Sequence, residues 1–308
     1  MKKYYRILLG KKNAFADEAY RGNFVAAGFI NDRDLTHDLA DNRRDFNKKF
    51  IPIWLQAHPG KAKVSAGLAC GMLWTVAKGL QVGDVVLCPD GKGSYYVGEV
   101  SGGYEYHKGQ SLPHRRPVRW FARSLMRDDM SDALKHSAGS IGTVSDLSDH
   151  ADELEKLLSG NAPQTIITTD TSIEDPSVFA LEKHLEDFLV QNWKSTELGK
   201  RYDIYEEDGE MAGQQYPSDT GPIDILAISK DKKELLVVEL KKGRVSDMVV
   251  GQTQRYMGYV KDELAEKGQS VRGVIIALED DIKIRRALAV ASNIDFYTYK
   301  VYFKLEKR

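Results

Sequence analysis

Three charged residues close two apolar segments in the last third of the chain. Asp224 lies within residues 221–228, and Glu239 and Lys241 end the segment at 235–241. A charge at the rim of a buried strand costs free energy unless it is paired or bound to a metal. Two carboxylates supply the oxygen ligands that Mg²⁺ prefers, and a nearby lysine can stabilise charge that develops on a phosphate. These residue types predict metal-dependent hydrolysis of a phosphodiester.

The spacing of these residues predicts which of them lie together. Side chains alternate along a strand, so Leu240 points to one face while Glu239 and Lys241 share the other. Gln252 and Tyr256 are one turn apart on the helix that follows, so they share a helix face. That face could meet the metal site or the substrate backbone.

The combination of elements carries more information than the motif alone. An Asp followed by Glu-x-Lys also occurs on solvated edge strands. With a preceding acidic helix and a following Gln-x-x-x-Tyr helix, residues 176–305 resemble the core of the PD-(D/E)XK nuclease superfamily, as in NucS-type and RecB-type enzymes. The resemblance implies that Asp224, Glu239 and Lys241 are catalytic. It implies that Gln252 and Tyr256 support them.

A carboxylate on the preceding helix would complete the metal site that the resemblance implies. Glu182 fits by position, so Asp224, Glu239 and Glu182 would hold Mg²⁺, with Mn²⁺ as a substitute. Glu186 flanks the same apolar stripe and competes with Glu182, and the sequence leaves this choice open. Asp219, in Pro-Ser-Asp-Thr-Gly, is better explained as a turn residue.

The element order around these residues predicts the fold of the C-terminal half. The pattern reads α-β-β-α-β-α-β, which predicts a mixed sheet flanked by helices, an α/β fold of the restriction-endonuclease-like kind. Asp175-Pro176 gives an N-cap and a first-turn proline for the first helix. The later elements are expected at 246–264 (helix), 271–277 (strand), 282–292 (helix) and 294–305 (strand).

The N-terminal half predicts an α+β domain with a small barrel. The segments around Gly83-Asp84 and at 94–100 are similar to PUA-like modules of the EVE and YTH kind, which implies a reader of modified or flipped-out bases. We therefore expect a recognition domain at 1–160, a small and polar linker at 161–175, and a nuclease domain at 176–308. Strands are expected at 4–9, 23–30, 82–88, 94–100 and 116–121, and helices within 34–55, 66–78 and 150–158.

A basic stretch without acidic residues runs from 107 to 127. Its arginines, interleaved with aromatic residues, predict contact with a phosphate backbone. The alternative is a solvated turn with paired charges. Trp74 and Trp54 are candidate walls of a base-binding cage, with core packing as the alternative for each. The arginines predicted to bind nucleic acid are Arg115, Arg116, Arg119 and Arg123.

Composition limits the remaining possibilities. The chain has 308 residues, enough for two domains, and a net charge of −1, so any surface for a polyanion is local. Lys and Arg outnumber Asp and Glu by 23 to 19 in residues 1–160, and are outnumbered 26 to 21 afterwards. Two cysteines form no disulfide framework, and there is no signal peptide, membrane span or Walker loop. We expect a cytoplasmic protein without a nucleotide cofactor.

These observations predict a Mg²⁺-dependent DNA endonuclease. A base-reading module joined to a nuclease resembles modification-dependent (type IV) restriction enzymes, which act in phage defence. Two alternatives stay open: a repair nuclease for mismatched or branched DNA, and a nucleic-acid-binding protein whose nuclease fold is inactive. DNA is the expected partner. A homodimer is also consistent, because cutting both strands needs two active sites.

Overall fold

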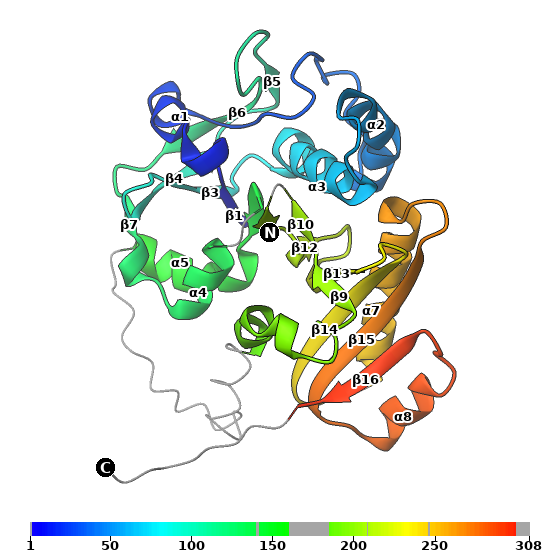
Figure 1. The fold of residues 1–308 in the computed structure, drawn as a ribbon. Helices are drawn as coiled ribbons and strands as arrows, with labels where there is room; N and C mark the ends of the chain where they lie inside the picture. The colour runs from blue at the N-terminus through cyan, green and yellow to red at the C-terminus, as the bar shows by residue number, and fades with distance from the viewer. Residues whose placement is uncertain (1, 140–141, 160–184, 208, 246, 300–308) are drawn as a thin grey trace. The chain divides into compact units, whose positions relative to one another are not determined.

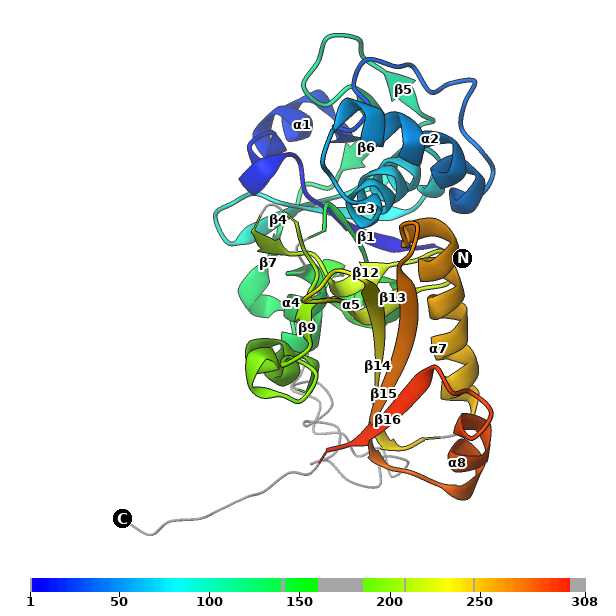
Figure 2. The same cartoon turned by 45° about the vertical axis from the view of Figure 1, so that its right-hand side comes forward.

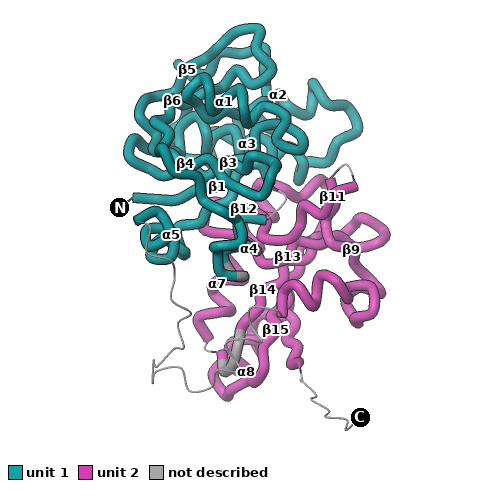
Figure 3. The backbone as a smooth tube through the Cα atoms, turned by 90° about the vertical axis from the view of Figure 1, so that its left-hand side faces the viewer, with its two compact units in different colours: residues 1–169 teal, residues 170–308 magenta. Residues whose placement is uncertain are grey.

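The computed structural model describes residues 2–139, 142–159, 185–207, 209–245 and 247–299 (Figure 1). The chain divides into two compact units, residues 1–169 and 170–308 (Figure 3). The predicted linker at 161–175 and the candidate Glu182 lie outside the described residues. Within the described part, no helix is long and apolar enough to cross a membrane.

The C-terminal unit is built on a mixed six-stranded sheet. Its order is β12-β13-β14-β15-β16, with β9 also paired to β13. The pairs of β13 with β9, β12 and β14 are antiparallel, and β14, β15 and β16 are parallel, so the predicted mixed sheet is confirmed. The strands are β9 (Tyr202–Ile204), β12 (Gln214–Pro217), β13 (Pro222–Ser229), β14 (Glu234–Arg244), β15 (Ser270–Glu279) and β16 (Ile294–Thr298); β10 (Glu206–Glu207) and β11 (Glu210–Met211) form a separate pair.

The central strands of this sheet are apolar because both of their faces are covered. One face packs on a cluster that includes Trp193 and Leu240. The helix α7 (Met248–Tyr259) lies along β14 and β15 (Figure 2). A Cβ at Gly273 would lie 2.7 Å from Met257 Sδ, so the glycine lets α7 approach the sheet closely.

The helices of the C-terminal unit follow the predicted order. A turn of π-helix at Val260–Leu264 extends α7, and α8 spans Ile282–Leu288. The Asp281 carboxylate caps α8 by accepting from the backbone N–H groups of Lys283 (2.8 Å) and Ile284 (2.9 Å). Residues 185–191 are helical, and a 3₁₀ turn follows at Trp193–Ser195.

The N-terminal unit contains an eight-stranded sheet with the order β2-β6-β4-β3-β1-β8. Strand β5 pairs with β6, and β7 pairs with β4. All neighbours are antiparallel except β1 and β3, which are parallel. The strands are β1 (Tyr4–Ile7), β2 (Phe24–Ala27), β3 (Val85–Pro89), β4 (Ser94–Val100), β5 (Glu105–Tyr106), β6 (His114–Trp120), β7 (Leu125–Met126) and β8 (Val144–Asp146).

Helices accompany this sheet, and the predicted α+β organisation is confirmed. The helices α2 and α3 pack together around Phe46, Phe50 and Leu73. The Asn42 side chain caps α2 by accepting from the N–H of Asp45 (2.9 Å). The helices are α1 (Ala16–Gly22), α2 (Arg43–Ala57), α3 (Lys63–Trp74), α4 (Asp132–Ala138) and α5 (Ala151–Leu158); short turns lie at Lys11–Asn13, Thr75–Gly79, Arg127–Asp129 and Ser148–His150.

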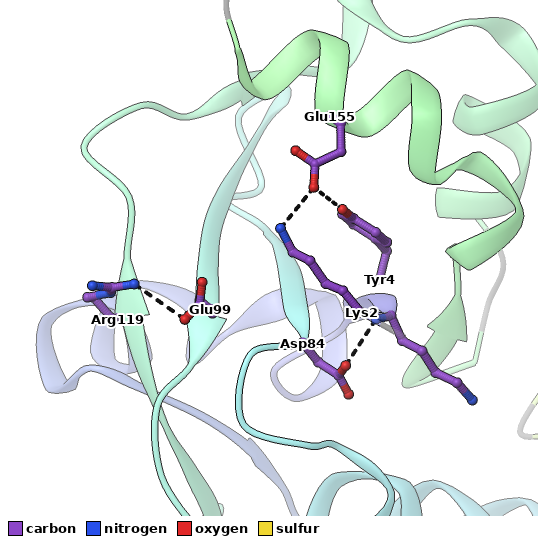
Figure 4. A network of polar contacts seen from close by, with 7 residues as sticks. Lys2, Tyr4, Asp84, Glu99, Arg119 and Glu155 are labelled. Atoms are coloured by element: carbon purple, nitrogen blue, oxygen red, sulfur yellow. Dashed lines mark hydrogen bonds and ion pairs between the residues drawn. The ribbon is translucent and has the colours of Figure 1, made fainter.

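Polar contacts tie the first strand to the end of this unit (Figure 4). Lys2 Nζ donates to Glu155 Oε1 on α5 over 2.8 Å, and the Tyr4 hydroxyl donates to the same oxygen. The Asp84 carboxylate accepts from the backbone N–H of Lys3 over 3.0 Å. These contacts join β1 to α5 and to the turn before β3, elements that are distant in sequence.

Candidate active site

The sheet register brings the two predicted acidic residues together. Ile225 pairs with Val238 across β13 and β14. Asp224 precedes Ile225 and Glu239 follows Val238, so the two acidic residues are neighbours at the end of this ladder and their charges interact. Asp224 Oδ2 also accepts a hydrogen bond from the backbone N–H of Leu240 over 2.7 Å. Like charges close together on neighbouring strands are destabilising, so this placement calls for a compensating cation.

Lys241 supplies part of that compensation. Its Nζ donates to Glu239 Oε1 over 2.6 Å, which shows that the two residues share a face. The Glu239 side chain is only 2% exposed, whereas that of Lys241 is 35% exposed. Glu239 Oε2 is buried and has no hydrogen-bond partner among the residues that the structure describes. One oxygen of the buried carboxylate is therefore neutralised by the lysine, and the other is available to a ligand.

The three groups perturb one another's protonation. Burial, followed by the charges of Glu239 and Glu186, raises the pKa of Asp224 to about 8. Burial also raises the pKa of Glu239, against the opposing effect of the Lys241 ion pair. Burial alone would lower the pKa of Lys241, but its hydrogen bond and charge interaction with Glu239, and the charge of Asp224, raise it. Lys241 therefore stays charged, and its single positive charge does not neutralise both Asp224 and Glu239.

The residues present fit a divalent cation. Two neighbouring carboxylates, one with an unpartnered buried oxygen, offer the ligands of a hard ion that keeps several waters. Among the described residues, no group of three Asp, Glu, His or Cys side chains lies close enough to hold a metal by itself. The third carboxylate predicted for the site, Glu182, lies outside the described residues.

Glu186, the competing helix carboxylate, is within reach of this site. Its Oε1 accepts from Gln214 Nε2 over 2.8 Å, and its Oε2 accepts from Gln215 Nε2 over 2.6 Å. Its charge contributes to the raised pKa of both Asp224 and Glu239. The sequence analysis missed Gln214 and Gln215, because they stand in a polar segment without the apolar alternation that marks a strand.

The two predicted supporting residues of α7 bond to each other, and Tyr256 interacts with the acidic pair. Gln252 Nε2 donates to the Tyr256 hydroxyl over 3.3 Å, as expected for residues one turn apart. Burial raises the pKa of Tyr256; the hydrogen bond from Gln252 opposes the shift, and the charges of Glu239 and Asp224 add to it. Gly221 precedes β13 with a φ of +127°, and a Cβ there would lie 3.1 Å from the Tyr256 hydroxyl oxygen.

The four predicted DNA-contacting arginines differ in exposure. The prediction does not hold for Arg116, because its buried guanidinium donates to the carbonyls of Gly102 (3.0 Å) and Ala77 (3.3 Å). Arg115 is also largely buried, with its guanidinium 3.7 Å from the centre of the Phe24 ring. Arg119 and Arg123 are exposed, and Arg119 pairs with Glu99 over 3.3 Å (Figure 4).

The two candidate cage tryptophans pack in the interior of the N-terminal unit. Trp54 is buried and stacks on His58, with the ring centres 4.0 Å apart. Trp74 is half-buried, and its indole N–H donates to the Ala40 carbonyl over 2.9 Å. Both belong to the cluster between α2 and α3. This placement fits the core role that the sequence left open as the alternative for each.

The geometry and the comparisons define the class of the C-terminal unit. A mixed sheet with Asp and Glu-x-Lys on adjacent strands, backed by a Gln-x-x-x-Tyr helix, has the arrangement expected of a PD-(D/E)XK nuclease core. Residues 181–301 match the family described as the endonuclease NucS C-terminal domain, so this part of the chain is similar to that domain. Residues 5–148 match a domain of unknown function, DUF8426.

Individual relatives match over a limited length. Endonuclease NucS of Methanocaldococcus jannaschii is 33% identical over 75 residues, which are 24% of this chain and 27% of that protein. The chain thus matches about a quarter of this curated relative. Among solved structures, a complex of EndoMS with double-stranded DNA is 13% identical, with a TM-score of 0.32 over 68% of this chain and 62% of that one. A repair endonuclease from Pyrococcus abyssi is 15% identical, with a TM-score of 0.30 over 69% and 66%.

The raised pKa of Asp224 predicts that the metal-free protein becomes less stable to unfolding as the pH rises. The carboxyl has a pKa of 3.8 when the chain is unfolded and about 8 when it is folded, so the folded protein binds this proton more tightly. Its contribution to the free energy of unfolding is fully present below about pH 4 and is lost as the pH rises to about 8. Asp224→Asn removes the titration. We therefore expect the difference in melting temperature between Asp224→Asn and the parent, measured in chelator, to increase in favour of the variant from pH 5 to pH 8. A constant difference across this range would contradict the assignment.

Proposed function

We propose that this chain is a divalent-metal-dependent DNA endonuclease, in which the C-terminal unit cuts DNA and the N-terminal unit selects it. The observation that supports this most directly is the Glu239 carboxylate, which has a lysine on one oxygen and, within the described part of the chain, no partner on the other. A buried charge of this kind costs free energy in a protein that has no use for it. The NucS-type domain at 181–301 agrees with the proposed activity.

The chain's own residues have distinct roles in this proposal. Asp224 and Glu239 hold the ion, for which Mg²⁺ is the best candidate and Mn²⁺ a substitute. When bound, such an ion neutralises phosphate charge and lowers the pKa of a bound water. Lys241, positively charged and partly exposed next to Glu239, stabilises the negative charge that gathers on the phosphate. Tyr256 and Gln252 form the wall of the site on the α7 side.

The N-terminal unit is proposed to contact DNA through exposed cations. Arg119 and Arg123 remain available for phosphates, since an exposed ion pair such as Arg119–Glu99 contributes little and exchanges partners readily. A PUA-like role for this unit, and a homodimer that cuts both strands, are parts of the same proposal.

Two classes of DNA target are consistent with this architecture. Selection of modified bases would make the protein a type IV restriction enzyme of phage defence, acting in the cytoplasm. Selection of mismatched or branched DNA would make it a repair nuclease, and the match to the NucS C-terminal domain is equally consistent with this class. A catalytically inactive DNA-binding protein is disfavoured, because binding alone does not require the Asp224, Glu239 and Lys241 arrangement.

A cleavage panel tests the activity and separates the two target classes. Plain, methylated, hydroxymethylated, mismatched and branched duplexes are incubated with the full chain in Mg²⁺ or Mn²⁺, and in chelator. We expect cutting only with metal, and a preferred target identifies the class: modified duplexes for restriction, mismatched or branched ones for repair. Asp224→Ala, purified in parallel, controls for contaminating nucleases. Binding of DNA without cleavage under every metal condition would leave only the inactive alternative.

A further inference from the structure

We infer that Gln215 is a positioning residue of the nuclease site, which fixes the Asp224 carboxylate through its side-chain amide. This inference rests on the proposed function, since it matters only if Asp224 binds a metal. It adds a residue that the Asp, Glu-x-Lys and Gln-x-x-x-Tyr pattern does not contain.

The amide of Gln215 bridges two carboxylates. Its Nε2 donates to Glu186 Oε2 over 2.6 Å and to Asp224 Oδ1 over 3.2 Å. An ionised carboxylate only accepts hydrogen bonds, so in the ionised, metal-binding form of the site the NH₂ group, and not the amide oxygen, faces both residues. The bridge places a neutral donor between two like charges and connects the helical residues 185–191 to the strand that carries Asp224.

The sheet register and the backbone both favour a specific role at this position. Gln214 pairs with Ile225 and Tyr216 pairs with Ile223, so Gln215 lies opposite Asp224 across β12 and β13. Gln215 has a φ of +49°, in the left-handed region that non-glycine residues seldom adopt. A non-glycine residue there costs about 1–2 kcal/mol. Glycine would avoid this cost, so the glutamine side chain has a compensating use.

The bridge completes the support of Asp224. Gln215 bonds to Oδ1 and the Leu240 N–H bonds to Oδ2, so both oxygens have a fixed direction. Each carboxylate oxygen has a further lone pair for a ligand. A carboxylate held in this way is oriented before the ion arrives, and loss of such a supporting residue lowers metal affinity by about 10–100-fold.

Because Gln215 has a left-handed backbone conformation, a glycine there can remove the side-chain amide without straining the backbone. Gln215→Gly removes the amide while relieving the backbone cost, so the fold should not be weakened at this position. Gln215→Asn also tolerates this backbone conformation and keeps an amide that is one methylene shorter. The matched control is Gln214→Ala: Gln214 donates to Glu186 and Asp187, so this change leaves the bond between Gln215 and Asp224 in place.

The test is calorimetric titration of Mn²⁺ into the full chain, together with thermal unfolding in chelator. We expect Gln215→Gly to lower Mn²⁺ affinity by about 10–100-fold without lowering the metal-free melting temperature. Gln215→Asn should fall between this variant and the parent, and Gln214→Ala should lose less affinity than Gln215→Gly. Parental affinity in Gln215→Gly, with Asp224→Ala abolishing binding, would overturn the role of Gln215 alone. No Mn²⁺ binding by the parent would overturn the proposed metal site as well.

Discussion

Asp224→Ala and Glu239→Ala are each expected to reduce metal-dependent DNA cleavage by at least about a thousandfold. The two residues lie next to each other on β13 and β14 and are the proposed oxygen ligands of the ion. Without either carboxylate the ion is lost, and several kcal/mol of charge stabilisation at the phosphate are lost with it. DNA affinity should change little, because the proposed cationic contacts lie on the N-terminal unit. Single-turnover cleavage and binding, measured on the same duplex, check both parts.

The turn between the same two strands offers a matched control. Asp231 is an exposed carboxylate there, hydrogen-bonded to the Ser229 hydroxyl over 2.6 Å. Asp231→Ala removes the same chemical group from the same hairpin and should leave cleavage at the parental rate. Cleavage by Asp224→Ala in Mg²⁺ at the parental rate would show that the metal, or the whole active site, lies elsewhere.

Lys241→Met is expected to slow the chemical step by about 10²–10³-fold, equivalent to roughly 3–4 kcal/mol. Methionine keeps most of the length of the side chain but removes the charge that now lies 2.6 Å from Glu239 Oε1. Metal affinity should stay the same or increase, because a cation that competes for Glu239 has been removed. Single-turnover rates at saturating metal, with the metal affinity measured separately, distinguish the two effects.

Lys233 serves as the control for this lysine. It is exposed in the turn just before β14, at the opposite end of the strand from Lys241. Lys233→Met changes the net charge of the domain by the same amount and should not alter the rate at saturating metal. If Lys241→Met also leaves the rate at saturating metal unchanged, Lys241 only neutralises the charge of Glu239 and has no part in the chemistry.

Local sequence pattern was sufficient to predict the centre of the C-terminal unit. Strands β13 and β14 are nearly continuous apolar runs joined by a short charged turn, so their pairing follows from adjacency along the chain. Alternation then places Glu239 and Lys241 on one face and Leu240 on the other. Gln252 and Tyr256 were predictable for a similar reason, since a spacing of four residues on a helix fixes a shared face.

Properties that depend on distant parts of the chain could not be predicted in this way. Arg116 belongs to a basic stretch without acidic residues, but the folded chain buries it. Its guanidinium donates hydrogen bonds to the carbonyls of Gly102 and Ala77, which belong to other segments. Gln215 gave no signal, because its contacts come from the helical residues 185–191 and from β13, on either side of it in the sequence. Strands β9 to β12 are only two to four residues long, too short for an apolar alternation to mark them in the sequence.

The close approach of α7 to the sheet at Gly273 makes the geometry of the active site depend on a residue without a side chain. Asp224 and Glu239 are on the sheet, whereas Tyr256 is on the helix. The distance between helix and sheet therefore sets how far the Tyr256 hydroxyl lies from the two carboxylates. Met257 Sδ and Thr253 Cγ2 already lie 2.7 and 2.8 Å from where a Cβ at Gly273 would be. Any larger residue there would act as a wedge between the layers. Substitution at position 273 is therefore expected to disturb the proposed active site, although glycine has no side chain to take part in the chemistry.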